Sequence, residues 1–67
     1  MNMKALAYMN CVILCLIRNY DLSEPDATEA VKKSYLYELL EQDPTGTMHD
    51  SVNSSAKNVY TEIYCNA

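Results

Sequence analysis

The sequence predicts a small all-α domain, a bundle of three to four helices around a hydrophobic N-terminal helix. Apolar residues recur at helical spacing along the chain, and no segment alternates as a strand does. Capping residues and two prolines divide the chain into helix-length pieces. With 67 residues the chain forms a single domain, residues 1–67. A domain near this size buries only about 60% of its unfolded surface, so we expect it to need an additional source of stability.

The first helix is expected over residues 3–20. Its broad apolar face consists of Ala5, Leu6, Met9, Val12, Ile13, Leu16, Ile17 and Tyr20. The opposite side carries Lys4 and Arg18 but also Ala7, Cys11, Leu14 and Cys15. A helix that is apolar nearly all round is buried on both sides or lies at an interface. Few residues remain to cover the second side, so we expect a partner chain to contact Ala7, Cys11, Leu14 and Arg18.

The second helix is expected over residues 24–33. Ser23 is a good N-cap, Pro25 is tolerated in a first turn, and Asp26 suits the positive end of the helix dipole. Ser34 then either caps a third helix over residues 35–42 or continues the second helix, since the apolar period fits both cases.

A helix break is expected at residues 43–46. Pro44 cannot continue a helix, and Gly46, the only glycine, can adopt a positive φ. After a linker, Asp50 or Ser51 is expected to cap the last helix, whose apolar stripe is Val52, Ala56, Val59, Tyr60 and Ile63. The predicted core consists of Leu6, Met9, Ile13, Leu16, Ile17, Leu36, Leu39, Leu40, Val59 and Ile63.

Membrane insertion and secretion are not expected. The unbroken apolar run covers only residues 11–17, whereas a membrane span needs about 20 residues. No small-x-small cleavage site follows this run. The three cysteines are an odd number, which favours reduced thiols in a cytoplasmic protein over a disulfide framework. Oligomerisation is then the expected source of extra stability.

The charge balance argues against nucleic-acid binding. Nine acidic residues against five basic ones give a formal net charge of −4. The second and third helices resemble a helix-turn-helix in outline, but the latter would present Glu38, Glu41 and Asp43 to phosphates. We therefore expect no contact with nucleic acid, and an acidic surface that suits a basic partner.

No catalytic, metal or cofactor site is expected. Cys11, Cys15, His49 and Cys65 could supply zinc ligands, but only the first two have the spacing of paired ligands, and both lie in the hydrophobic helix. His49 beside Asp50 suggests a general base, yet no nucleophile is visibly paired with it. We interpret these residues as structural, and the chain as a non-enzyme.

All six aromatic residues are tyrosines, which are enriched where a ring is dry at one end and wet at the other. We expect Tyr20, Tyr35 and Tyr60 at the rim of the core. Tyr37 and Tyr64 fall off the apolar stripes and are predicted partner contacts. Rim tyrosines of a monomer are the alternative interpretation.

A looser pattern covers residues 13–62. It combines an apolar helix with Leu22-Ser23-x3-Ala27, Ser34-x2-Tyr37-x2-Leu40, Asp43-Pro44-x-Gly46 and Val59-Tyr60-x-Glu62. This pattern resembles a class of short, largely uncharacterised bacterial α-helical proteins, some of them encoded beside toxin–antitoxin modules. The resemblance implies a partner-binding or regulatory role and no catalytic residue.

Two functions fit these observations. The first is a protein-interaction module that forms a homodimer through the N-terminal helix. The second is a small acidic inhibitor or antitoxin-like protein that masks a basic surface of a partner with Glu38 and Glu41.

Overall fold

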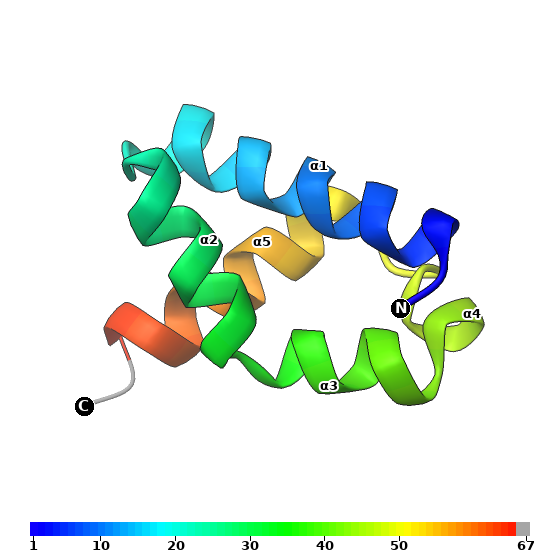
Figure 1. Ribbon diagram of the computed structural model, residues 1–67. Coiled ribbons are helices and arrows are strands. Elements are labelled where there is room, and N and C mark those ends of the chain that lie inside the picture. The colour runs from blue at the N-terminus through cyan, green and yellow to red at the C-terminus, as the bar shows by residue number, and fades with distance from the viewer. Residues whose placement is uncertain (66–67) are drawn as a thin grey trace.

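The computed structural model describes residues 1–65, and it confirms the predicted all-α bundle. The order is α1 (Met3–Tyr20), α2 (Glu24–Lys33), α3 (Tyr35–Gln42), α4 (Pro44–Thr47), α5 (Val52–Tyr60) and the π-helical turn η1 (Thr61–Cys65) (Figure 1). Four of these, α1, α2, α3 and α5, are the helices that the sequence predicts. The single turn α4 lies in the segment expected to be a break.

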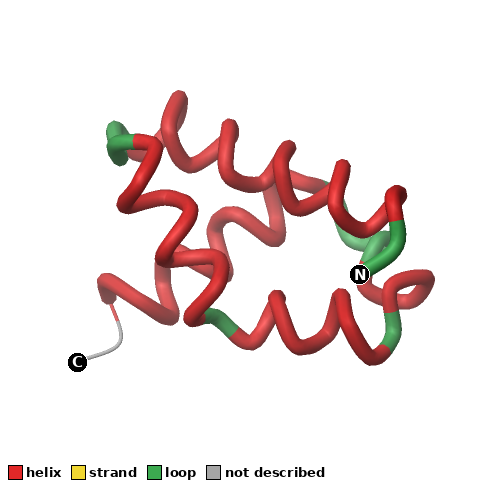
Figure 2. The backbone as a smooth tube through the Cα atoms, viewed as in Figure 1, coloured by secondary structure: helices red, strands yellow, loops and turns green. Residues whose placement is uncertain are grey.

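Helix α1 is the element on which the others pack. It contacts α2, α3 and α5, and it runs along one edge of the molecule while α3 runs along the opposite edge (Figures 1 and 2). Helix α2 connects the two edges, and α5 lies between them in the view of Figure 1. The molecule measures 27 × 22 × 18 Å along its principal axes.

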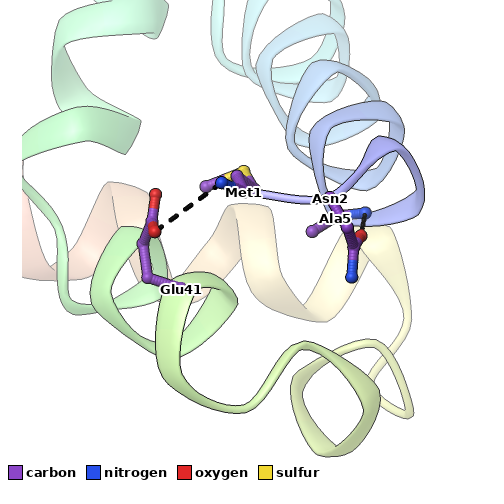
Figure 3. A network of polar contacts seen from close by, with 4 residues as sticks. All are labelled: Met1, Asn2, Ala5 and Glu41. Carbon is purple, nitrogen blue, oxygen red and sulfur yellow. Dashed lines mark hydrogen bonds and ion pairs between the residues drawn. The ribbon is translucent and has the colours of Figure 1, made fainter.

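Both ends of α1 are capped. The Asn2 side chain accepts the backbone N–H of Ala5 at 2.7 Å, and the Met1 ammonium lies 3.8 Å from Glu41 of α3 (Figure 3). At the other end Asp21 adopts a left-handed conformation, φ 56°, and its N–H bonds to the Leu16 carbonyl. This is the usual way in which an α-helix satisfies its last carbonyls.

Ser34 separates α2 from α3, which resolves the alternative that the sequence left open. Its backbone is extended, with ψ 162°, and its buried hydroxyl donates to the Val31 carbonyl at 2.7 Å. Ser34 therefore does not cap α3 with its side chain. The carboxylate of Glu62 in η1 does so instead, accepting the N–H of Tyr35 at 3.1 Å.

The segment after Asp43 forms a helical turn, and Gly46 does not use the positive φ that glycine can adopt. The Asp43 side chain caps α4 by accepting the Gly46 N–H at 3.2 Å. A Cβ atom on residue 46 would lie 2.9 Å from Cγ of Asp43. A side chain at position 46 would therefore push the capping carboxylate of Asp43 aside, whereas the backbone angle itself does not require glycine.

Most of the predicted core is buried. Met9, Ile13, Leu16, Leu36, Leu40 and Val59 are buried, and Ile17, Leu39 and Ile63 are half-buried. Leu6 was wrongly placed in the core, because the buried face of α1 centres on Ala5, Met9 and Leu16 and leaves Leu6 46% exposed. Seven further residues are buried although they were not predicted in the core: Ala5, Val12, Cys15, Ala27, Ala30, Val31 and Ala56. Several of these are small side chains, which allow helices to pack closely.

Candidate protein-interaction surface

The side of α1 that faces away from the core carries four residues predicted to bind a partner. Ala7, Cys11, Leu14 and Arg18 are all exposed, and Leu14 is 51% exposed. We call these four residues the outer face of α1. The buried residues Ala5, Met9, Val12 and Leu16 lie on the other side of the same helix. The outer face is therefore an apolar helix face that the chain's own core leaves uncovered.

The spacing of the outer face is that of a helix-packing seam. Its residues follow one another at intervals of four, three and four, as do the contact positions of packed helices. Ala7 and Cys11 are short, whereas Leu14 is long, which provides both holes and a knob. A shallow hollow of about 280 Å³ beside Leu14 lies between α1 and the start of α5.

Cys15 does not belong to this face, although the sequence placed it there. It is buried toward α5, where its thiol donates to Oδ1 of Asn53 at 3.3 Å. It also accepts a hydrogen bond from Nδ2 of Asn19 at 3.1 Å. The physical reason is that α5 covers more of α1 than the apolar stripe alone suggests.

The outer face has a basic residue at or near each of its ends. Helix α1 contains Lys4 and Arg18 and no acidic residue, although the whole chain has a formal net charge of −4. Both basic residues are exposed and lie near opposite ends of the helix. Two copies of this face would therefore repel each other weakly at their ends.

The other predicted contact residues lie elsewhere. Glu38 and Glu41 are exposed on α3, at the opposite edge from α1 (Figure 1). Tyr64 is exposed on η1 and stacks on Tyr60, with ring centroids 5.2 Å apart. Tyr37 is half-buried and packs against the core. The structure therefore does not unite these four residues with the outer face of α1.

Tyr35 and Tyr37 exchange the environments expected for them. Tyr35, predicted at the core rim, is 59% exposed, whereas Tyr37 packs on the core. The cause is the orientation of α3: Leu36 and Leu40 turn inward and fix which side chains flank them. Tyr20 and Tyr60 do meet at the rim, stacked with their centroids 4.6 Å apart.

A second surface feature was not found from the sequence. A cleft of about 340 Å³ lies between α3, α4 and α5, and we call it the α3–α5 cleft. Its lining includes the apolar side chains of Leu36, Leu39 and Val59 and the acidic side chains of Asp43, Asp50 and Glu62. These residues lie between positions 36 and 62 and come together only in the folded chain, where Glu62 of η1 reaches the start of α3.

Among the residues that the structure describes, none with a basic side chain lines this cleft. Within residues 1–65 the ion pairs are Met1 with Glu41 and Lys33 with Glu29, the latter at 2.6 Å. The hydrogen bond from Lys33 lowers the pKa of Glu29 and raises the pKa of Lys33. The carboxylates of Asp43, Asp50 and Glu62 have no such partner among these residues.

Comparisons with known proteins and the remaining geometry add three results. No protein-family model, curated protein or solved structure matches the chain. Among residues 1–65, no three or more histidine, cysteine or acidic side chains are grouped so that they could hold a metal ion. In the same part of the chain no helix combines the length and hydropathy needed to cross a membrane.

Proposed function

We propose that this protein is a non-catalytic interaction module that self-associates through the outer face of α1. The observation that supports this proposal is the exposure of Ala7, Cys11 and Leu14 along one seam of the longest helix. Burying that seam against a second copy removes apolar surface from water, which favours association. In most homodimers a two-fold axis brings the same face of both copies together, and a contact between two outer faces has this symmetry.

The dimer is expected to be weak. An 18-residue helix is about 27 Å long, and one helix face buries less than the roughly 1,200–2,000 Å² typical of stable complexes. The fraction of dimer should therefore rise over an accessible range of protein concentration. Salt should strengthen it, because Lys4 and Arg18 of the two copies repel each other and ions screen that repulsion.

The test is the substitution Leu14→Glu, which places a charge in the centre of the outer face. We expect it to reduce the fraction of dimer at least tenfold, while the circular dichroism spectrum stays helical because Leu14 is exposed. The average mass, measured by light scattering on a reduced sample over a concentration series, gives the readout.

The matched control is Gln42→Glu. It adds the same single charge at an exposed position of α3, at the opposite edge of the molecule. Its mass should follow that of the unmodified protein. Equal masses for both variants and the unmodified protein at every concentration would contradict self-association through α1.

A second candidate is a small acidic protein that masks a basic surface of a partner. Glu38 and Glu41 are exposed on α3, but the Met1 ammonium lies 3.8 Å from Glu41 and partly offsets its charge. The observation that favours this candidate is the α3–α5 cleft, whose carboxylates have no cation among the residues that line it.

A further inference from the structure

We infer that the α3–α5 cleft binds a lysine or arginine side chain that a partner protein presents. The inference rests on the second candidate function and is independent of self-association through α1. The cleft combines an apolar floor, an exposed tyrosine and three carboxylates that pair with no basic side chain within residues 1–65.

The floor of the cleft suits an alkyl chain. Leu36 and Val59 are buried and Leu39 is half-buried, and all three contribute to the lining. The volume of about 340 Å³ is at the lower end of the range for binding pockets, about 300–1,000 Å³. Lysine and arginine bury an aliphatic stem along such a surface while the charged head stays near water.

The carboxylates supply the complementary charge. Two of them are held in place: Asp43 accepts the Gly46 N–H at 3.2 Å, and Glu62 accepts the Tyr35 N–H at 3.1 Å. The Asp50 side chain has no hydrogen bond within residues 1–65. All three carboxylates line the same cleft, so a cationic side chain that enters it is attracted by negative charge from more than one side.

The features of the cleft favour a side chain from a protein over a small free cation. A strongly hydrated ion gains nothing from the apolar floor, whereas the stem of arginine or lysine does. Tyr35 lines the cleft and is 59% exposed. Tyrosine is enriched among the residues that contribute most of the binding energy at protein interfaces, and the face of its ring attracts a cation.

The experiment titrates the ¹⁵N-labelled full chain with a short amphipathic peptide of leucine and arginine. Gly46 is the only glycine, so its amide signal is readily assigned, and it lines the cleft. We expect saturable shifts at Gly46, Tyr35 and Asn58 that weaken as salt is added. The amide signals of Ala7 and Leu14, on the outer face of α1, serve for comparison and should not shift.

Two neutral variants test the charges. Asp50→Asn removes a charge whose side chain makes no described hydrogen bond, and Glu62→Gln keeps an oxygen that can accept the Tyr35 N–H. Each substitution should lower the affinity for the peptide about two- to fivefold, as expected for exposed charge pairs. The control Glu24→Gln, at an exposed position of α2 outside the cleft lining, should leave the affinity within about twofold.

Three results would overturn the inference. The first is equal binding by all three variants. The second is that the arginine peptide shifts only the amide signals of Ala7 and Leu14. The third is equally strong binding of spermidine, which would show that positive charge alone is recognised. The outcome is separate from that of the dimer test, because salt acts in opposite directions on the two interactions.

Discussion

At the scale of single residues, Tyr8 is the side chain that connects α1 to the start of α5. Its hydroxyl lies 2.7 Å from the Asp50 carbonyl, 3.2 Å from the Ser51 carbonyl and 2.7 Å from Oγ of the buried Ser55. The ring packs against the core at the same time. A tyrosine is needed at this position because phenylalanine would fill the space but leave these polar groups without their partner.

The substitution Tyr8→Phe should therefore lower the free energy of unfolding by about 1–2 kcal/mol. Urea denaturation followed by circular dichroism measures the change. Ser55→Ala serves as the partner in a double-mutant cycle. It should lower the free energy of unfolding less in the Tyr8→Phe background than in the unmodified protein. An unchanged urea midpoint for Tyr8→Phe would show that the three contacts contribute no net stability.

Individual side chains also show where sequence reasoning succeeds and where it fails. Periodicity identified Met9, Leu16 and Val59 as core residues because each lies at the centre of an apolar stripe. It failed for Leu6 and Tyr35, which lie at the edges of their stripes. Exposure at an edge depends on which helix packs beside it, and no local pattern carries that information.

At the scale of helices, the ends were more predictable than the faces. Ser23 caps as expected by accepting the N–H of Asp26, and of the two predicted candidates for the cap of α5 it is Ser51 that accepts the N–H of Ser54. These caps act three residues along the chain, so a short stretch of sequence reveals them. The cap of α3 by Glu62 spans 27 positions and depends on the tertiary structure.

The cap of α5 can be tested with neighbouring serines. Ser51→Ala should lower the free energy of unfolding by about 1 kcal/mol, because it leaves the Ser54 N–H without its side-chain acceptor. Ser54→Ala is the matched control, since Ser54 contributes its backbone N–H to the cap and its side chain is exposed. Thermal unfolding should separate the two variants, and equal melting temperatures would exclude a stabilising role for the Ser51 hydroxyl.

At the scale of the whole molecule, two surfaces differ in their chemistry. The outer face of α1 is apolar with basic ends, whereas the α3–α5 cleft has acidic sides over an apolar floor. The first could be predicted because its residues share one helix and one period. The second could not, since its residues come from α3, the α4 region, α5 and η1, which only the folded chain brings together.

The central claim is that the outer face of α1 meets its own copy. Cys11 lies on that face near the middle of α1, so in a two-fold contact the Cys11 residues of both copies come close in either helix orientation. Cys15 is buried, and Cys65 is the remaining exposed thiol. The variant Cys65→Ser therefore leaves a single exposed thiol, which a short bismaleimide can link to its copy.

The most direct measurement is the mass of reduced Cys65→Ser protein after treatment with that reagent. We predict a covalent dimer, and its loss when Leu14→Glu is added. A product that remains a monomer, although a simple maleimide labels Cys11 fully, would contradict self-association through α1.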